Sequence, residues 1–80
     1  MPQPTVTIYT TPTCAYCRMA KQYFAEHKIE YTEKNVAVDP EARKAMIEKS
    51  NQMGVPVIDI GGKIIVGFDE DKITQALHAL

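Results

Sequence analysis

The order of apolar and polar residues divides the chain into alternating strand-like and helix-like segments. Residues 5–10 are rich in β-branched side chains, and Val6 and Ile8 fall on one face of an extended segment, which predicts a strand. From Ala15 onward the apolar positions change from alternation to helical spacing. These positions are Met19, Ala20, Tyr23, Phe24 and His27. The pattern therefore predicts a strand, a short loop and an amphipathic helix.

The middle of the chain repeats this arrangement. A second strand starts near Glu30 or Tyr31 and runs to residue 36. A strand, a helix and a strand of this length make a βαβ unit, so we expect the first two strands to be parallel, with a right-handed crossover. Asp39 is a favourable N-cap and Pro40 a favourable first helical residue, which predicts a second helix that ends near Asn51.

The last part of the chain predicts two strands and a helix. Residues 55–60 form a third strand, Gly61 and Gly62 a hairpin turn, and residues 63–66 a fourth strand. Asp69 caps a final helix with an apolar stripe. The stripe consists of Ile73, Ala76, Leu77 and Leu80. The complete pattern, β-α-β-α-β-β-α, predicts one α/β domain over residues 1–80, with a four-stranded mixed sheet flanked by three helices.

Charge and hydropathy exclude several functional classes. The 9 basic and 10 acidic residues are interspersed and give a net charge of −1, so no basic field is available for nucleic acid or an anionic membrane surface. No apolar run approaches the roughly 18 residues of a membrane span, and no signal sequence is evident. We therefore expect a cytoplasmic monomer. In a reducing compartment, a close pair of cysteines indicates catalysis or metal binding rather than a structural disulfide.

The candidate chemistry lies at Cys14 and Cys17, at the predicted junction between the first strand and the first helix. Unpaired amides and the dipole at a helix N-terminus favour a thiolate at Cys14. Arg18, one turn after Cys14, and Lys21, one turn after Cys17, add positive charge. Cys17 shares a helix face with Cys14 and can close a disulfide with it. The spacing thus predicts thiol–disulfide exchange, in which Cys14 attacks and Cys17 resolves the mixed disulfide.

Three motifs in this order of elements carry a family resemblance. Cys14-Ala15-Tyr16-Cys17 follows the first strand, Val55-Pro56 begins the third, and Gly67-Phe68-Asp69 precedes the last helix. Together they resemble the glutaredoxin family, which has a thioredoxin-like fold, and are closest to the small bacterial YruB-type and NrdH-like redoxins. The resemblance implies a dithiol oxidoreductase that reduces protein disulfides or glutathione mixed disulfides.

The same resemblance implies where a substrate would lie. It places a cis peptide bond between Val55 and Pro56, which leaves the Val55 backbone free to pair with an extended cysteinyl segment. It places the γ-glutamyl carboxylate of glutathione at the N-terminus of the last helix, at Phe68 and Asp69, where free amides suit an anion.

Other positions have implied roles or depart from the family pattern. Tyr16, between the cysteines, is expected to line the substrate groove, and Gln52 could hydrogen-bond the glycyl carboxylate of glutathione. Thr11 and Met53 stand where many glutaredoxins carry basic residues, and Gly54 stands where they carry threonine. Ala15 replaces the proline of the common Cys-Pro-Tyr-Cys motif. Two positive contacts to glutathione are therefore missing.

Partners and alternatives follow from these residues. We expect disulfide-containing proteins as substrates, no tightly bound cofactor, and either glutathione as co-substrate or thioredoxin reductase as electron donor. A metal or iron–sulfur module is the main alternative, because thiolates are soft ligands. One CxxC pair supplies only two of the four ligands of a structural zinc site, so a cluster would have to be shared with a second chain. A dedicated electron donor to an enzyme such as ribonucleotide reductase is a narrower alternative.

Overall fold

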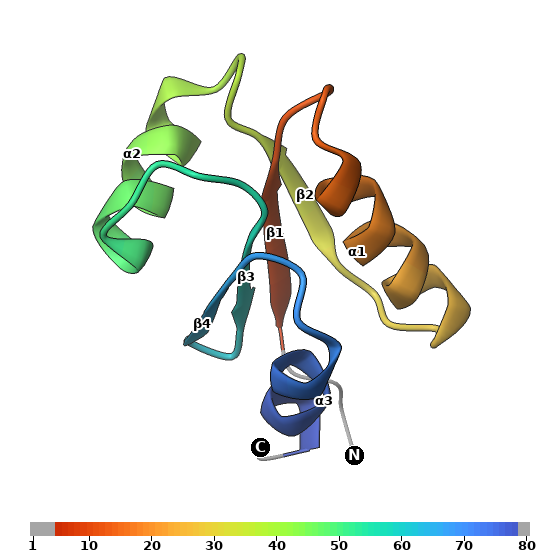
Figure 1. Cartoon of the computed structure of the whole chain (residues 1–80). Helices are drawn as coiled ribbons and strands as arrows, with labels where there is room; N and C mark the ends of the chain where they lie inside the picture. The colour runs from red at the N-terminus through yellow and green to blue at the C-terminus, as the bar shows by residue number, and fades with distance from the viewer. Residues whose placement is uncertain (1–4, 79–80) are drawn as a thin grey trace.

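The computed structural model describes residues 5–78, which form four strands and three helices (Figure 1). Their bounds are β1 Val6–Thr10, α1 Ala15–Glu26, β2 Thr32–Asn35, α2 Pro40–Ser50, β3 Val57–Ile60, β4 Lys63–Val66 and α3 Glu70–His78. The strand order in the sheet is β2-β1-β3-β4. Strand β1 pairs parallel to β2 and antiparallel to β3, and β3 pairs antiparallel to β4. The predicted mixed sheet and the predicted element order are confirmed.

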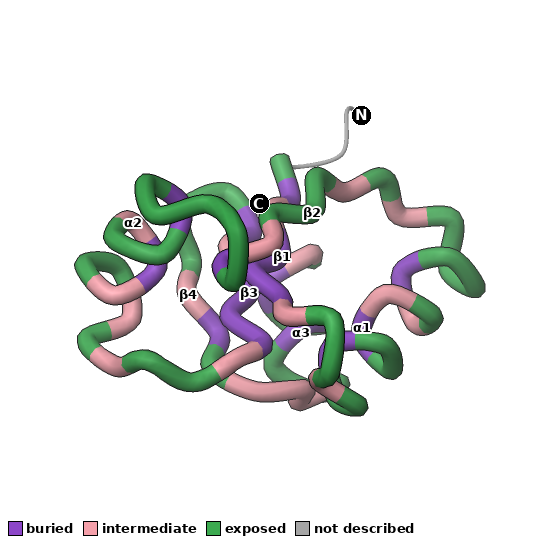
Figure 2. Tube along the Cα trace, turned by 90° about the horizontal axis from the view of Figure 1, so that it is seen from above, coloured by how far each residue is buried: buried purple, intermediate pink, exposed green. Residues whose placement is uncertain are grey.

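The side-chain alternation along β1 and β3 creates a core on each face of the sheet. Ile8 pairs with Ile58, and Ile58 with Ile65, so the three lie in a row across the sheet. This row packs with buried side chains of α1 and α3, whereas Tyr9 and Val57 of the same strands pack with α2. Figure 2 shows the buried residues concentrated along the two central strands. Two helices therefore cover one face of the sheet and one covers the other (Figure 1).

Helix α2 begins and ends at the signals in the sequence. The Asp39 carboxylate accepts a hydrogen bond from the Ala42 amide at 3.1 Å, and Pro40 occupies the first turn. Asn51 follows the helix in the left-handed conformation, with φ 59°, and donates its amide to the Ile47 carbonyl. Left-handed Asn is a common helix stop. The predicted cap and the predicted end are confirmed.

Two strands begin later than predicted. Strand β2 begins at Thr32, which is the first residue of the ladder and pairs with Thr7 of β1, and it ends at Asn35, one residue before the predicted end. Strand β3 begins at Val57 rather than Val55, because Pro56 has no N–H to donate to a ladder. Its carbonyl instead accepts the Gly67 amide at 2.8 Å. Predicted stripe residue Leu80 lies outside the described residues.

The final helix starts at the predicted cap. The Asp69 carboxylate accepts the Lys72 amide at 3.1 Å, and Ile73 and Ala76 are buried against the sheet. Among residues 5–78, no helix has both the length and the apolar character required to cross a membrane.

Candidate active site

Cys14 caps the helix that carries Cys17. Its backbone is extended, with φ −89° and ψ 112°, and its Sγ accepts a hydrogen bond from the Cys17 amide at 3.1 Å. A sulfur atom thus takes the place of the side-chain oxygen that usually caps a helix N-terminus. The Cys14 carbonyl accepts the Arg18 amide, which closes the first turn. A negative charge on this sulfur would be stabilised by the amide and by the helix dipole.

The two thiols differ sharply in exposure. Cys14 is partly exposed, whereas Cys17 is 1% exposed, and both are free. Burial raises the pKa of Cys17 to about 12, and a hydrogen bond to the Cys14 side chain contributes further. A substrate disulfide can therefore reach Cys14, while Cys17 stays protonated and close beside it.

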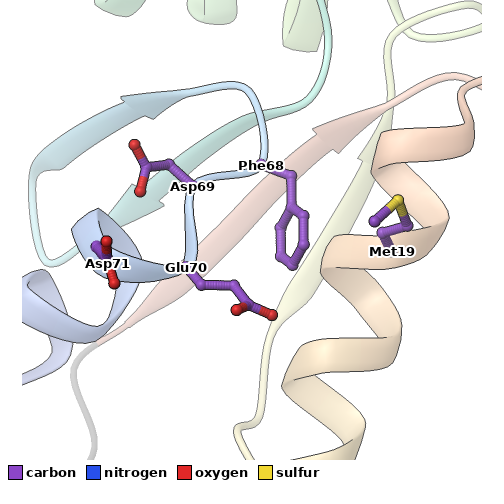
Figure 3. Close-up of a pocket in the computed structure, with 5 residues that line it drawn as sticks. All are labelled: Met19, Phe68, Asp69, Glu70 and Asp71. Atoms are coloured by element: carbon purple, nitrogen blue, oxygen red, sulfur yellow. The ribbon is translucent and has the colours of Figure 1, made fainter.

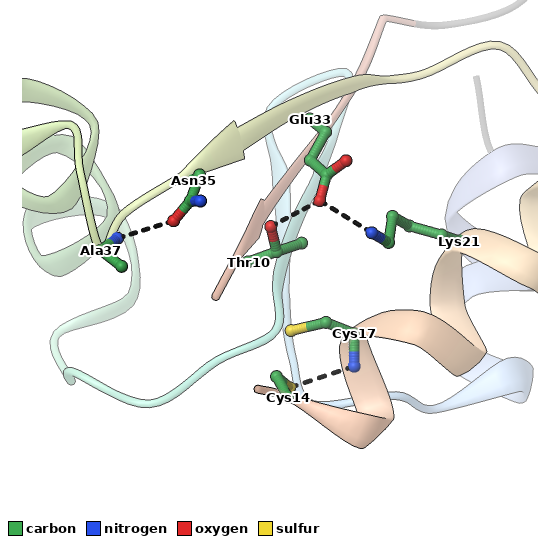
Figure 4. A network of polar contacts seen from close by, with 7 residues as sticks. All are labelled: Thr10, Cys14, Cys17, Lys21, Glu33, Asn35 and Ala37. Atoms are coloured by element: carbon green, nitrogen blue, oxygen red, sulfur yellow. Dashed lines mark hydrogen bonds and ion pairs between the residues drawn. The ribbon is translucent and has the colours of Figure 1, made fainter. Parts of the chain in front are cut away.

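A polar group lies near the cysteines and joins Thr10, at the end of β1, to Glu33 of β2 and Lys21 of α1. Glu33 Oε2 accepts a hydrogen bond from Thr10 Oγ1 at 2.7 Å and forms an ion pair with Lys21 Nζ at 2.9 Å (Figure 4). These two contacts hold the pKa of Glu33 below its ordinary value, the bond from Lys21 being the larger cause. Thr10 is 2% exposed, so the carboxylate is fixed to a rigid point of the sheet. The positive charge of Lys21 lowers the pKa of Cys17, against the effect of burial.

The loop before β3 is closed by the side chain of Gln52. Gln52 Oε1 accepts the Gly54 amide at 2.7 Å, and Gln52 Nε2 donates to the Gly54 carbonyl at 2.9 Å. The peptide bond between Val55 and Pro56 is cis, as the family resemblance implied. The side-chain amide of Gln52 is therefore hydrogen-bonded to the backbone of Gly54, the residue that precedes Val55.

A groove lies between α1 and the start of α3. It has a volume of about 480 Å³ and is lined by Met19, Phe68, Asp69, Glu70 and Asp71. Figure 3 shows the Phe68 ring between the two helices, on the side toward Met19. Tyr23 packs edge-on against Phe68, with ring centroids 6.0 Å apart. The groove thus combines an apolar floor, formed by Met19 and Phe68, with an acidic rim, formed by Asp69, Glu70 and Asp71.

Comparison with known proteins assigns the chain to a family. The sequence model of the glutaredoxin family, described as Glutaredoxin, matches residues 6–65. The chain belongs to the glutaredoxin family. A glutaredoxin-like 8.6 kDa protein in a rubredoxin operon of Clostridium pasteurianum is 43% identical over 73 residues, which cover 91% of this chain and 97% of that protein. A glutaredoxin of Pseudomonas aeruginosa is 36% identical over 77 residues, or 96% of this chain and 84% of the relative.

A solved structure supports the same assignment. The glutaredoxin-like protein NrdH-redoxin from Escherichia coli matches with a TM-score of 0.80 and 28% identity, over 89% of this chain and 92% of that one. The fold is therefore the thioredoxin-like fold of glutaredoxins, and the family is one of thiol oxidoreductases. The cysteine pair is the redox motif of this glutaredoxin-family chain.

The remaining predicted site residues of this glutaredoxin lie on α1, in the groove beside it and in the loop before β3. Tyr16 is 61% exposed, between the two cysteines, and Arg18 is exposed on the same helix. Phe68 and Asp69 line the groove beside α1. Gln52 contacts Gly54. In the part of the chain that the structure describes, no group of three or more His, Cys, Asp or Glu side chains is arranged to hold a metal ion.

Sequence reasoning missed two members of the polar group. Lys21 was visible from its spacing, because it follows Cys17 by one turn. Glu33 and Thr10 gave no such signal, since they are 23 residues apart. They meet because β1 and β2 are parallel, with Ile8 opposite Glu33 and Thr10 opposite Asn35. Only the strand register could have indicated this contact.

Proposed function

We propose that this protein is a dithiol oxidoreductase that reduces disulfides in other proteins, with Cys14 as the attacking thiolate and Cys17 as the resolving thiol. The observation that carries the proposal is the unequal environment of the two sulfurs. Cys14 Sγ is accessible and receives the Cys17 amide at 3.1 Å, while Cys17 is buried and protonated. A thiolate is the nucleophile in thiol–disulfide exchange, and access decides which thiol meets the substrate.

The reaction then has two exchanges. The Cys14 thiolate attacks one sulfur of the substrate disulfide and forms a mixed disulfide, and the electron pair of the broken bond leaves on the other substrate sulfur. Cys17 loses its proton and attacks Cys14 Sγ, which releases the second substrate thiol and leaves a Cys14–Cys17 disulfide. The substrate gains two electrons and two protons overall, and the protein loses them. An external donor returns the pair to the dithiol state.

The substrate is proposed to lie across Tyr16, the Val55 backbone beside Pro56, and the groove at Phe68 and Asp69. The accessible aromatic side chain and the apolar groove floor suit an extended peptide next to the attacking sulfur. Glutathione could use the same surface. The acidic rim disfavours its carboxylates, and Gln52 would have to release Gly54 to bind one of them. These features favour a protein reductase, such as thioredoxin reductase, over glutathione as electron donor.

Insulin reduction tests the proposal. We expect the wild-type protein to accelerate reduction, Cys14→Ser to abolish the acceleration, and Cys17→Ser to accumulate a mixed disulfide that mass spectrometry detects. Lys44→Met is the control, because it changes an exposed lysine of α2 and leaves both sulfurs and the proposed substrate surface intact. Equal activity of the wild type and Cys14→Ser would contradict the assignment of the attacking thiol. Reduction of the oxidised protein by glutathione and by thioredoxin reductase, measured in parallel, identifies the donor.

A further inference from the structure

Lys21 is held in one place although its side chain is partly exposed. It follows Cys17 by one turn of α1, and its Nζ lies 2.9 Å from Glu33 Oε2. The same carboxylate oxygen accepts the hydroxyl of the buried Thr10 at 2.7 Å. Most long surface side chains lose rotamer freedom for little gain in stability when they form an exposed ion pair. The position of this ion pair beside the redox pair calls for a functional explanation.

The second exchange of the proposed reaction has an electrostatic problem. Cys17 must ionise in a site where burial strongly favours its neutral form. The groups that act on its sulfur come from several elements: the Cys14 side chain, the Thr11 backbone amide, and Lys21. Glu33 of β2 carries the opposing charge and is paired with Lys21. Figure 4 shows Cys17 between Cys14 and the group formed by Thr10, Lys21 and Glu33.

We propose that Lys21, fixed by Glu33 and Thr10, stabilises the Cys17 thiolate at the moment when Cys17 displaces the substrate from Cys14. Glu33 is then a positioning residue, since it acts through Lys21. The inference rests on the proposed function, because it concerns the second exchange of that reaction. It assigns no role to Lys21 in the first exchange, in which Cys14 attacks.

The step is balanced without any further reactant. The electron pair of the Cys17 thiolate forms the new bond to Cys14 Sγ, and the pair of the broken bond leaves on the substrate sulfur. The proton that Cys17 gives up passes to solvent, and the released substrate thiolate takes up a proton in turn. Lys21 remains an ammonium throughout, and only its electrostatic attraction changes the rate.

The size of the effect follows from thiol reactivity. Removal of the Lys21 charge raises the pKa of Cys17, so the thiolate fraction near neutral pH falls. A more basic thiolate is also more nucleophilic, with a Brønsted coefficient of about 0.4–0.5, which recovers about half of that loss on a logarithmic scale. Because Lys21 is partly exposed, we expect Lys21→Met to slow the second exchange only about two- to threefold.

Stopped-flow reaction with dithiodipyridine, a neutral aromatic disulfide, separates the two exchanges. Each exchange releases one chromophoric thiol, so the wild type gives two phases of equal amplitude when the reagent is concentrated enough to make the first exchange the faster one. We expect Lys21→Met to slow the second phase and leave the first unchanged, and Lys21→Arg to restore it. Lys44→Met, which removes an exposed lysine from α2, should change neither phase. The difference between wild type and Lys21→Met should shrink at high salt, because the lysine is partly exposed and its field is screened.

Each outcome has one meaning. An unchanged second phase in Lys21→Met, or a Lys21→Arg variant as slow as Lys21→Met, would overturn the inference while two phases still support the proposed function. Release of one equivalent of chromophoric thiol by the wild type, instead of two, would instead contradict the proposed function. In a Glu33→Gln background, Lys21→Met should slow the second phase less than in the native background. An equal effect in both backgrounds would contradict the positioning role of Glu33.

Discussion

The contact between Gln52 and Gly54 allows a sharp test of how the loop before β3 is held. Substitution of Gly54 by alanine would place a Cβ atom 2.8 Å from Gln52 Oε1, closer than real contacts allow. The Gln52 side chain must then swing away and release both hydrogen bonds to Gly54. The Gly54 backbone itself is outside the left-handed region, so alanine is compatible with its conformation.

Two opposing effects set the change in the free energy of unfolding that Gly54→Ala causes. Each released hydrogen bond is exposed to solvent, so we assign each about 0.5 kcal/mol, the lower end of the net range. Alanine in place of glycine recovers about 0.5 kcal/mol by restricting the unfolded chain. Gly54→Ala should therefore lower the free energy of unfolding by about 0.5 kcal/mol, and Gln52→Ala should lower it by about 1 kcal/mol. In the Gln52→Ala background, Gly54→Ala should raise it by about 0.5 kcal/mol.

Urea unfolding of the four proteins, with the thiols kept reduced, measures this cycle. The diagnostic result is that Gly54→Ala destabilises the wild type but stabilises the Gln52→Ala variant. The coupling between the two positions should be about 1 kcal/mol, within the range seen for residues in contact. If the two substitutions were additive to within about 0.3 kcal/mol, the reasoning would be refuted, because the two residues would then act independently.

Three further predictions concern other parts of the fold. Phe24 is completely buried, so Phe24→Ala should reduce the free energy of unfolding in urea by about 3–5 kcal/mol, and a loss below about 1.5 kcal/mol would contradict its central place in the core. Asp39→Ala removes the cap of α2 and should cost about 1 kcal/mol in the same assay, with Asp39→Asn as the control that retains a capping oxygen. Hydrogen bonds to Asp59 and then Tyr9 raise the pKa of Lys49 above its ordinary 10.5. The contribution of the protonated Lys49 to the free energy of unfolding is therefore complete below pH 10.5 and is lost as the pH rises through the folded-state pKa. The urea midpoint of Asp59→Asn should therefore fall less steeply over this alkaline range than that of the wild type, and equal slopes would show that the pair contributes nothing.

Local signals made most of the fold predictable. The alternation of Val6 and Ile8, the cap at Asp39 and the Gly61-Gly62 turn each act over a few residues, and each element they predicted is present. The starts of strands were less predictable, because they depend on pairing. Val55 has a strand-forming side chain, but the missing N–H of Pro56 moves the start of β3 to Val57.

The site residues were likewise predictable where the signal is local and not predictable where it depends on strand pairing. Spacing was sufficient to find Cys14 and Cys17, because both lie on one helix turn. The contact of Glu33 with Lys21 depends on the parallel register of β1 and β2, which the sequence does not specify locally. Gln52 was predicted as a contact of the glycyl carboxylate of glutathione from the family resemblance. Its hydrogen bonds to Gly54 arise from a turn conformation that the residue types alone do not indicate.

The burial of Cys17 also imposes an order on the flow of electrons. In the proposed reaction, a folded partner is too large to contact Cys17, which is 1% exposed, so it exchanges electrons with this protein only through Cys14. Every oxidant and every reductant must then compete for the same single entry point. A partner bound to Cys14 excludes all others until Cys17 has displaced it, and the protein therefore reacts with one partner at a time.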